Sequence, residues 1–308
     1  MEMIIVKNKI VIIGCGNVGM SYAYALLNQK TPVSELVLID INTEKAKGEA
    51  MDLNHGLPFG PSKINIYQGD YSDCSDAKIV CIAAGANQEA KETRMDLIYK
   101  NSVIFKSIIK NVIASSFQGI FLIATNPVDV MTYLTFKYSN FPTNKVIGTG
   151  TILDTARLRY LIGEKTKVNP KNIHAYVMGE HGDSEFVPWS LAKVGLEDIN
   201  KYLTIEDQED FYVKVRDAAY EIIERKGNTS YGIGMSLVRI TNAILGDENT
   251  ILAVSSYDET NKVFVGGPTI INKDGVRKRI FVDLTKDEEK KLQNSINVIK
   301  EAINKVDL

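Results

Sequence analysis

The sequence predicts an α/β fold, in which an open, Rossmann-type doubly wound parallel sheet comes first and an α+β domain follows. In the first half, short apolar runs alternate with helix-like segments, which is the pattern of parallel strands joined by helices. After about residue 148 this alternation gives way to longer helices and later β-like runs. We therefore expect two domains, residues 1–148 and 149–308, that meet at a tight hinge.

The elements of the first domain follow from two patterns. Short apolar runs with β-branched residues predict strands that are buried on both faces: Lys9–Ile13, Glu35–Asp40, Lys78–Ala83, Ile120–Thr125 and Lys145–Ile147. Apolar residues at helical spacing predict helices between them: Val18–Gln29, Asn42–Asp52 and Asp96–Ser115.

The second domain is expected to contain more helix and less strand. The predicted helices are Leu153–Leu161, Glu206–Arg225 and Ser236–Leu245, with β-like segments at Ile173–Met178 and within Val263–Ile271. Thr285 and Glu288 form a capping-box pattern, which predicts the start of a final helix. No internal repeat or low-complexity stretch interrupts this order.

Composition narrows the class of protein. A length of 308 residues with 44% hydrophobic and 24% charged residues is typical of a globular protein. The net charge of −2, with mixed signs along the chain, favours neither a nucleic-acid nor a membrane partner. The three cysteines lack paired spacing and the N-terminus lacks a signal-peptide layout, so we expect reduced thiols, a cytoplasmic protein and no metal site.

A glycine pattern follows the first predicted strand. Gly14, Gly16 and Gly19 have the spacing of the Rossmann-type dinucleotide fingerprint, which allows a sharp turn and a close approach to pyrophosphate. The helix that starts here offers free N–H groups to phosphate. Asp40 ends the second strand, where a carboxylate accepts ribose hydroxyls and repels a 2′-phosphate, so NAD is preferred over NADP. The alternative is a tight turn that binds no ligand.

His181 lies in the polar, glycine-flanked segment Gly179–Ser184. Histidine is the side chain whose ordinary pKa lies near neutrality, so it suits proton transfer. Asp154 and Arg157 are three residues apart on a predicted helix and share a face. The carboxylate could orient the imidazole and the guanidinium could bind a substrate carboxylate. The alternatives are a surface histidine and an ordinary intrahelical ion pair.

The segment Gly85–Arg94 follows a strand end, where ligands bind in such sheets. It is polar and could close over a substrate, which would bring Arg94 to a carbonyl and Gln88 to the variable end of the substrate. Asn126 ends another strand at the same edge and could donate a hydrogen bond to the substrate oxygen. The alternative is a solvated surface loop.

Several motifs in this order resemble the L-lactate/L-malate dehydrogenase family across essentially the whole chain. They are Gly14–Gly19, Met51–His55, Ala84–Ala86 with Arg94, Thr125–Asp129, Gly148–Arg157 and Gly179–Ser184. The resemblance implies that His181 and Asp154 form a proton relay, that Arg94 polarises the carbonyl and that Arg157 binds the substrate carboxylate. It also implies an NAD cleft lined by Val18, Asp40, Lys45, Tyr71, Gly85, Ala86, Asn126 and Thr149.

Substrate choice within the family depends on the position of Gln88, where malate dehydrogenases carry an arginine. A neutral residue would leave a second carboxylate buried without a counter-charge, at a cost on the order of several kcal/mol. Thr229 also resembles the lactate branch. The resemblance thus implies NAD-dependent interconversion of pyruvate and (S)-lactate, the last step of homolactic fermentation. Alternatives are a dehydrogenase of bulkier 2-hydroxy acids, a malate dehydrogenase, and a catalytically idle NAD-binding subunit.

A second site is suggested by Arg159 and His174. An arginine and a histidine at these two positions resemble those of certain bacterial family members. Fructose 1,6-bisphosphate activates those enzymes by binding between the subunits of a homotetramer. Arg159 is two residues from Arg157 and so points to the other side of its helix. The alternative is a surface arginine and a histidine with a structural role.

Overall fold

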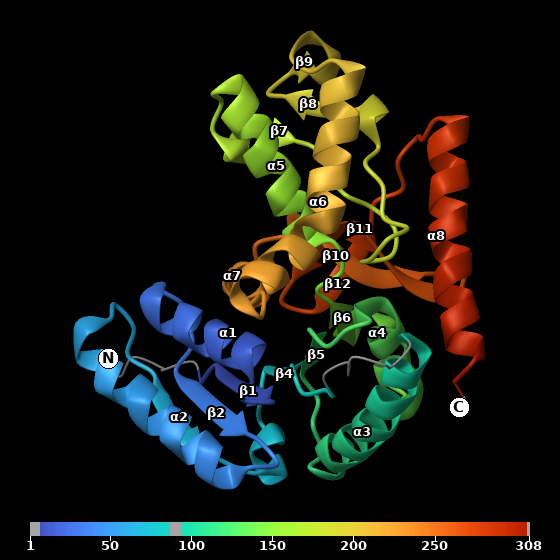
Figure 1. Ribbon diagram of the computed structural model, residues 1–308. Coiled ribbons are helices and arrows are strands. Elements are labelled where there is room, and N and C mark those ends of the chain that lie inside the picture. Colours follow the sequence, from blue (N-terminus) through green and yellow to red (C-terminus); the bar gives the residue numbers. More distant parts are fainter. Residues whose placement is uncertain (1–6, 87–93, 307–308) are drawn as a thin grey trace.

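The computed structural model describes residues 7–86 and 94–306, and the side chains of residues 94–96 lie outside this description. Figure 1 shows a sheet flanked by helices in the lower part of the molecule and a smaller lobe above it. The N-terminal helices lie on one side, and the last helix runs along the opposite edge beside both parts (Figure 1).

The first half alternates strands and helices as the sequence predicts. The strands are β1 (Lys9–Ile13), β2 (Glu35–Ile39), β3 (Asn65–Gln68), β4 (Ile79–Ile82), β5 (Ile120–Ile123) and β6 (Val146–Gly148). The helices are α1 (Asn17–Asn28), α2 (Thr43–Gly56), α3 (Arg94–Ala114) and α4 (Val128–Ser139). The predicted strands and helices are found, with ends that differ by up to four residues, whereas β3 and α4 were not predicted.

The second half contains helices α5 (Ile152–Thr166), α6 (Ile205–Lys226), α7 (Tyr231–Leu245) and α8 (Lys286–Asn304). Its strands are β7 (Ile173–His174), β8 (Lys193–Val194), β9 (Glu197–Asp198), β10 (Thr250–Asp258), β11 (Val263–Asn272) and β12 (Gly275–Arg279). The capping box at Thr285 and Glu288 is confirmed, since each side chain bonds the other residue's backbone N–H. The expected β-segment Ile173–Met178 is mostly wrong. Its partner β8 is two residues long, so regular pairing stops after His174.

The strands form a nine-stranded sheet in the order β12-β11-β10-β6-β5-β4-β1-β2-β3, and β7, β8 and β9 form a separate small sheet. The strands from β6 to β3 are parallel, and every residue of β1 is buried because helices cover both faces. β10 joins the sheet antiparallel to β6 through the pair Ser255 and Gly148. The sheet therefore continues across the boundary expected near residue 148.

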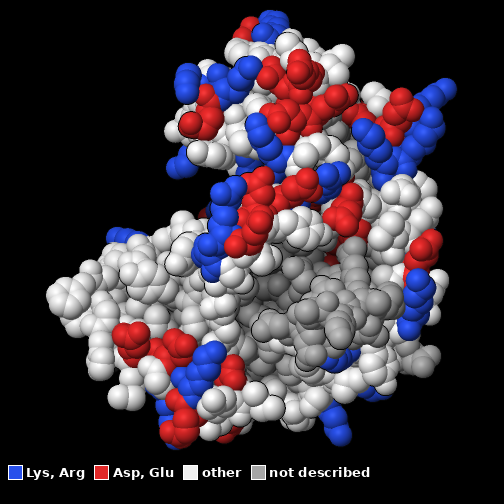
Figure 2. Space-filling model, in the orientation of Figure 1, with Lys and Arg blue, Asp and Glu red and all other residues white. Residues whose placement is uncertain are grey.

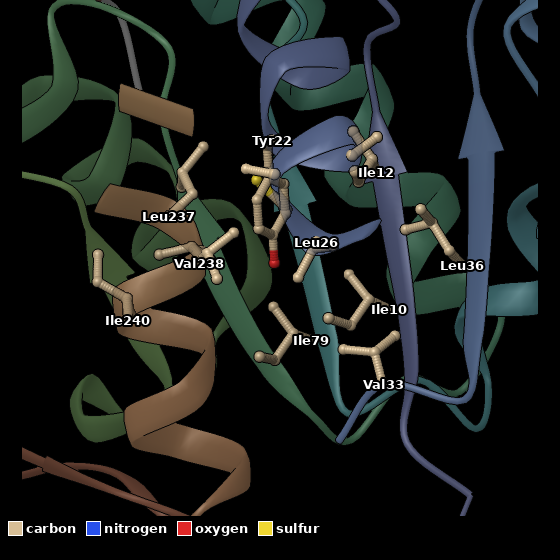
Figure 3. Packing of buried hydrophobic residues seen from close by; sticks show 14 of the residues in the cluster. Ile10, Ile12, Tyr22, Leu26, Val33, Leu36, Ile79, Leu237, Val238 and Ile240 are labelled. Atoms are coloured by element: carbon tan, nitrogen blue, oxygen red, sulfur yellow. The ribbon is translucent and has the colours of Figure 1, made fainter. Parts of the chain in front are cut away.

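Helix α7 fastens the second half to the first. Leu237 and Val238 of α7 pack with Tyr22 and Leu26 of α1 against the inner strands, as Figure 3 shows. The Tyr22 hydroxyl lies 2.5 Å from Oγ1 of Thr241 on α7. This packing joins the two halves of the chain.

Charges of both signs are interspersed on the face shown in Figure 2, without a continuous basic surface among the described residues of that face. Among the described residues, no helix is both long and apolar enough to cross a membrane.

Candidate active site

His181, Asp154 and Arg157 form a continuous ion-pair network. Asp154 Oδ2 lies 2.7 Å from His181 Nδ1, and Asp154 Oδ1 accepts a hydrogen bond of 2.8 Å from Arg157 Nη1. The Asp154 side chain is 2% exposed, whereas those of His181 and Arg157 are 25% and 15% exposed. One buried carboxylate thus orients an imidazole and a guanidinium, and both remain partly open to a ligand.

The charges of this network favour a protonated imidazole. Burial of His181 favours its neutral form, but the Asp154 carboxylate outweighs this and raises the pKa of His181 to about 9. Burial also acts to raise the pKa of Asp154, and the charges of His181 and Arg157 hold it below its usual range instead. Because Nδ1 bonds the carboxylate, Nε2 is the ring nitrogen that can give a proton to a ligand.

Asp129 holds the backbone of the histidine loop. Its Oδ2 accepts the His181 N–H at 2.8 Å, and its other oxygen accepts a hydrogen bond from the hydroxyl of Ser255 on β10. Asp129 is 1% exposed, and burial raises its pKa to about 6 against the two hydrogen bonds, which lower it. Sequence reasoning did not assign a role to Asp129.

The loop is also fixed at Gly179. This residue has φ +101°, and its backbone exchanges N–H···O bonds of 3.0 and 2.9 Å with Gly266 of β11. The next N–H, of Glu180, donates to Ser295 Oγ of α8 at 2.5 Å. A Cβ at Gly179 would lie 2.5 Å from the same Ser295 oxygen, so this glycine allows the close approach of α8.

The glycine turn after β1 has the geometry that the sequence predicts. Gly14 has φ +105°, and a Cβ there would lie 2.5 Å from Ala84 N. A Cβ on Gly19 would lie 2.0 Å from Gly14 O, so this glycine lets α1 approach the turn. At Gly16 a Cβ would meet nothing within 4 Å. Gly16 therefore faces open space at the N-terminus of α1, where a pyrophosphate would be bound.

Asp40 closes the other side of this turn. Its carboxylate accepts the N–H of Cys15 at 2.7 Å and the N–H of Asn42 at 2.9 Å, and the residue is half-buried. Lys45 is exposed in the first turn of α2, just beyond Asp40. Val18 is half-buried in the first turn of α1.

The edge of the sheet next to the turn carries the other expected cofactor residues. Gly85 and Ala86 follow β4, Asn126 follows β5 and is exposed, and Thr149 follows β6 and is buried. Asn101 of α3 joins two of these segments. Its Oδ1 accepts the Ala86 N–H at 2.8 Å, and its Nδ2 donates to Asn126 O at 3.0 Å. A polar residue on the buried side of a helix was the signal that could have identified Asn101.

Among the described residues, Tyr71 makes no hydrogen bond to the glycine turn. It is half-buried after β3 and packs in the cluster of β4 and α3, where burial raises its pKa and Asn111 of α3 bonds its hydroxyl. Its role in the cofactor site stays a prediction.

These residues fit NAD. The donor set combines an open glycine at a helix N-terminus with a carboxylate, Asp40, at the end of the adjacent strand. This is the chemistry that recognises a pyrophosphate and a ribose with a free 2′-hydroxyl.

Two expected substrate residues are not placed. Gln88 lies outside the described residues, and of Arg94 only the backbone, at the start of α3, is described. Thr229 is half-buried in the connection between α6 and α7.

Arg159 lies on another side of α5 from Arg157. Its Nε donates to Ala175 O at 3.0 Å, and its guanidinium lies 4.7 Å from the ring centroid of Tyr176. His174 is exposed on β7, next to Ala175. The two residues are thus on neighbouring parts of one surface.

Donor atoms of Asp154, His181 and Glu185 lie within 4.8 Å of one another, a spacing that could hold a metal ion. Both Asp154 oxygens already bond His181 and Arg157. The cluster is therefore accounted for by the ion-pair network, and the absence of a metal stays a prediction.

Comparisons with known proteins agree with this geometry. Residues 8–148 match the model of the lactate/malate dehydrogenase NAD-binding domain, and residues 151–307 match that of the lactate/malate dehydrogenase α/β C-terminal domain. The L-lactate dehydrogenase of Geobacillus sp. (strain WCH70) is 52% identical over 97% of this chain and 96% of its own length. L-lactate dehydrogenase 1 of Bacillus cereus (strain ATCC 10987) is 50% identical, with 96% of this chain and 97% of the relative covered.

Solved structures give the same result. The minor L-lactate dehydrogenase of Enterococcus mundtii, in its ligand-bound form, superposes with a TM-score of 0.96 at 44% identity, covering 98% of this chain and 99% of that one. A lactate dehydrogenase from a Medee basin deep-sea metagenome library gives 0.95 at 50% identity, with 97% and 98% covered. The chain, with an NAD-binding first domain, belongs to the lactate/malate dehydrogenase family.

Proposed function

We propose that this chain catalyses the NAD-dependent interconversion of pyruvate and (S)-lactate, as an L-lactate dehydrogenase. The observation that carries the proposal is the network of His181, Asp154 and Arg157 in a chain that also has the dinucleotide turn. Its relatives at about 50% identity are named L-lactate dehydrogenases.

The residues divide the chemistry among them. Bound NADH supplies the hydride that reduces a carbonyl carbon. His181 Nε2 gives its proton to the carbonyl oxygen, and Asp154 stabilises the charged imidazole and holds its orientation. Arg157, whose Nη1 is fixed by Asp154, presents the rest of its guanidinium to the substrate carboxylate. Asn126 donates a hydrogen bond to the substrate oxygen.

Arg94, Gln88 and Thr229 complete the proposal. We place Arg94 beside the carbonyl when the segment before α3 closes, and Gln88 and Thr229 at the methyl end of the substrate. The residues proposed to bind NAD are Gly14, Gly16, Val18, Gly19, Asp40, Lys45, Tyr71, Gly85, Ala86, Asn126 and Thr149. Residues 1–148 would then bind the cofactor and residues 149–308 would supply most substrate groups.

A substrate panel tests the proposal. The purified protein with NADH is assayed on pyruvate, oxaloacetate and 2-ketoisocaproate, and kcat/KM is expected to be highest for pyruvate. His181→Asn, which cannot carry the proton, is expected to lower kcat by about 10²–10⁴-fold. A preference for 2-ketoisocaproate or oxaloacetate would establish one of the other 2-hydroxy acid activities. Absence of turnover on all three substrates would refute the proposed dehydrogenase activity.

The role of Gln88 is tested by Gln88→Arg. An arginine supplies a counter-charge for a second substrate carboxylate, so the ratio of kcat/KM for oxaloacetate to that for pyruvate is expected to rise at least about tenfold, or about 1.4 kcal/mol. An unchanged ratio would show that this position does not select the substrate.

We also propose a homotetramer. Exposed apolar side chains lie on four helices that pack in the order α2, α1, α7, α5. They are Tyr24, Met51, Tyr160, Tyr231 and Met235, each more than half exposed. An apolar surface of this kind is typical of a subunit interface.

Fructose 1,6-bisphosphate is the proposed effector of this assembly, bound by Arg159 and His174. An anion that binds the active assembly preferentially lowers its free energy. Activity at low pyruvate is measured with and without the bisphosphate, in the parent protein and in Arg159→Gln. We expect the bisphosphate to lower KM for pyruvate in the parent only, and equal KM values in the parent would exclude this site.

A cytoplasmic location is proposed from the cysteines. Cys15, Cys74 and Cys81 are free and buried, and burial raises the pKa of each thiol, to about 12 for the first two. Inert reduced thiols suit a reducing compartment.

A further inference from the structure

Glu185 is a buried acidic side chain to which the proposed mechanism gives no role. It follows His181 by four residues, and its N–H donates to Gly182 O at 3.0 Å in the same loop. The residue is 3% exposed, and its Oε1 is buried without a hydrogen-bond partner among the described residues. An unpartnered buried carboxyl disfavours folding, so stability does not explain it.

The carboxyl group faces the histidine–aspartate pair. One of its oxygens, a ring nitrogen of His181 and an oxygen of Asp154 lie within 4.8 Å of one another. At this separation the charge of one group changes the proton affinity of the next. Glu185 is therefore the third titratable group of the network.

On another side Glu185 borders a cavity of about 500 Å³. The cavity is also lined by Trp189, by Tyr212 of α6 and by Lys290 of α8, and the loop passes between these two helices in Figure 1. Exposed side chains such as Glu209 and Lys290 line it too, so solvent protons can reach Glu185 without passing the substrate site.

Titratable groups of several elements lie near Glu185. Those that act on it are Asp154 and Arg157 of α5 and Glu180 and His181 of the loop. Asp129 of α4 acts on the neighbouring His181, and Tyr212 of α6 feels the charges of Glu185, Arg216 and Asp183. The charged residues that line the same cavity are Asp183, Glu209, Lys290 and Lys291. Burial, and then the Asp154 carboxylate, raise the pKa of Glu185 to about 9, in the range of His181. Two close groups with similar proton affinity titrate as a pair.

We propose that Glu185 is a positioning residue that sets the charge state of the His181–Asp154 pair, acting through the imidazole and not on the substrate. Near pH 9, where both groups titrate, ionised Glu185 stabilises the imidazolium while His181 carries its proton. When His181 has given its proton away, Glu185 takes up a proton from solvent and becomes neutral, so no unpaired negative charge is buried. This role rests on the function proposed above.

The test is the pH dependence of kcat/KM, measured for pyruvate with NADH and for lactate with NAD. Glu185→Gln keeps the shape of the neutral acid but cannot become negative. In the pH profile of each reaction, we expect the limb, which is the rise or fall that follows the titration of His181, to move to lower pH by about one unit. The reason is that the imidazolium loses a stabilising charge. Glu209→Gln, an exposed change of the same charge on the same cavity, is the control and is expected to leave both limbs in place.

A second readout separates this role from a packing defect. The His181 ring is titrated by NMR without substrate, its signal assigned with His181→Asn among three histidines. Glu185→Gln is expected to lower the midpoint, and Glu185→Asp, which restores a carboxylate, is expected to bring it back toward the parent. An unchanged midpoint in Glu185→Gln, or lower turnover with unmoved limbs, would overturn the inference. If Glu185→Gln does not fold, Glu185→Ala takes its place in the titration, and an unchanged midpoint in that variant would overturn the inference. A parent protein that reduces no 2-keto acid would instead refute the proposed function.

Discussion

Asp154 is the residue on which the chemistry of this protein centres. It is almost fully buried, yet it makes one bond to an imidazole and one to a guanidinium. A buried carboxylate that lost either partner would be left with uncompensated charge. In the proposed mechanism the same two bonds serve two purposes, because they orient the proton donor and the carboxylate-binding cation at once.

The raised pKa of His181 leads to a pH prediction. Its pKa of about 9 lies above the ordinary 6.5, so the protonated form predominates at neutral pH. Pyruvate reduction needs that proton, so kcat/KM is expected to fall as pH rises through about 9. Lactate oxidation needs the neutral ring and is expected to rise over the same range.

Asp154→Asn is the matched variant for this measurement. An amide cannot raise the pKa of His181, so both limbs are expected to move toward lower pH, with kcat lowered by about 10²–10⁴-fold. Limbs that stay in place in Asp154→Asn would show that another group sets the pH dependence.

Which site residues could be predicted depended on their chemistry. His181, Asp154 and Arg157 are recognisable because a loop histidine and an i, i+3 ion pair are local patterns. Asp129 bonds the backbone of His181, 52 residues away, and Asn101 bonds that of Ala86, 15 residues away. No local pattern in the sequence signals such contacts. Glu185 is four residues from His181, but its burial was not visible in a polar loop.

At the scale of elements, the turn from β1 to α1 gives each glycine a different task. Gly14 and Gly19 are required by the fold, since a side chain at either would overlap backbone atoms. Gly16 has free space around it and is left to the ligand.

This difference predicts opposite effects of two similar substitutions. Gly19→Ala is expected to destabilise the protein by about 1–3 kcal/mol, because its Cβ would lie 2.0 Å from Gly14 O. Gly16→Ala is expected to leave the melting temperature nearly unchanged but to weaken NADH binding about tenfold, or about 1.4 kcal/mol. Thermal unfolding and NADH fluorescence titration measure the two. A Gly16→Ala protein with parental NADH affinity would argue against pyrophosphate at this turn.

Three elements that the sequence did not predict, α4, β3 and β12, lack a local pattern. Helix α4 is buried on nearly all sides, so it has no polar face and no apolar stripe to detect. β3 is an edge strand with one fully buried residue, and β12 carries three basic residues, Arg277, Lys278 and Arg279. Neither β3 nor β12 has an alternating apolar pattern of its own. Each becomes a strand by pairing with a neighbour, β3 with β2 and β12 with β11.

At the scale of the whole molecule, one sheet runs through both halves of the chain. β10 and β11 extend the parallel strands in antiparallel pairing, and β11 also holds Gly179 beside the histidine. The proposed proton donor is thus attached to the same sheet that carries the glycine turn.

The exposed apolar side chains of α2, α1, α7 and α5 lead to a prediction about assembly. Tyr231→Glu combined with Met235→Glu places charges where the proposed interface is apolar, so the dissociation constant between subunits is expected to rise at least about tenfold. Phe281→Glu, an exposed aromatic outside these helices, serves as control. Sedimentation equilibrium compares the three proteins, and equal masses at equal concentration would place the interface elsewhere.

The amino-acid sequence by itself determined the alternating elements, the glycine turn and the proposed proton donor with its ion pair. These depend on periodicity, backbone freedom and side-chain chemistry within a few residues. The tertiary structure alone decided that β10 continues the first sheet, that Asp129 and Ser295 fix the histidine loop, and that Glu185 lies against the pair. Such contacts join residues distant in the chain, and they form only when burial of the shared core brings their elements together.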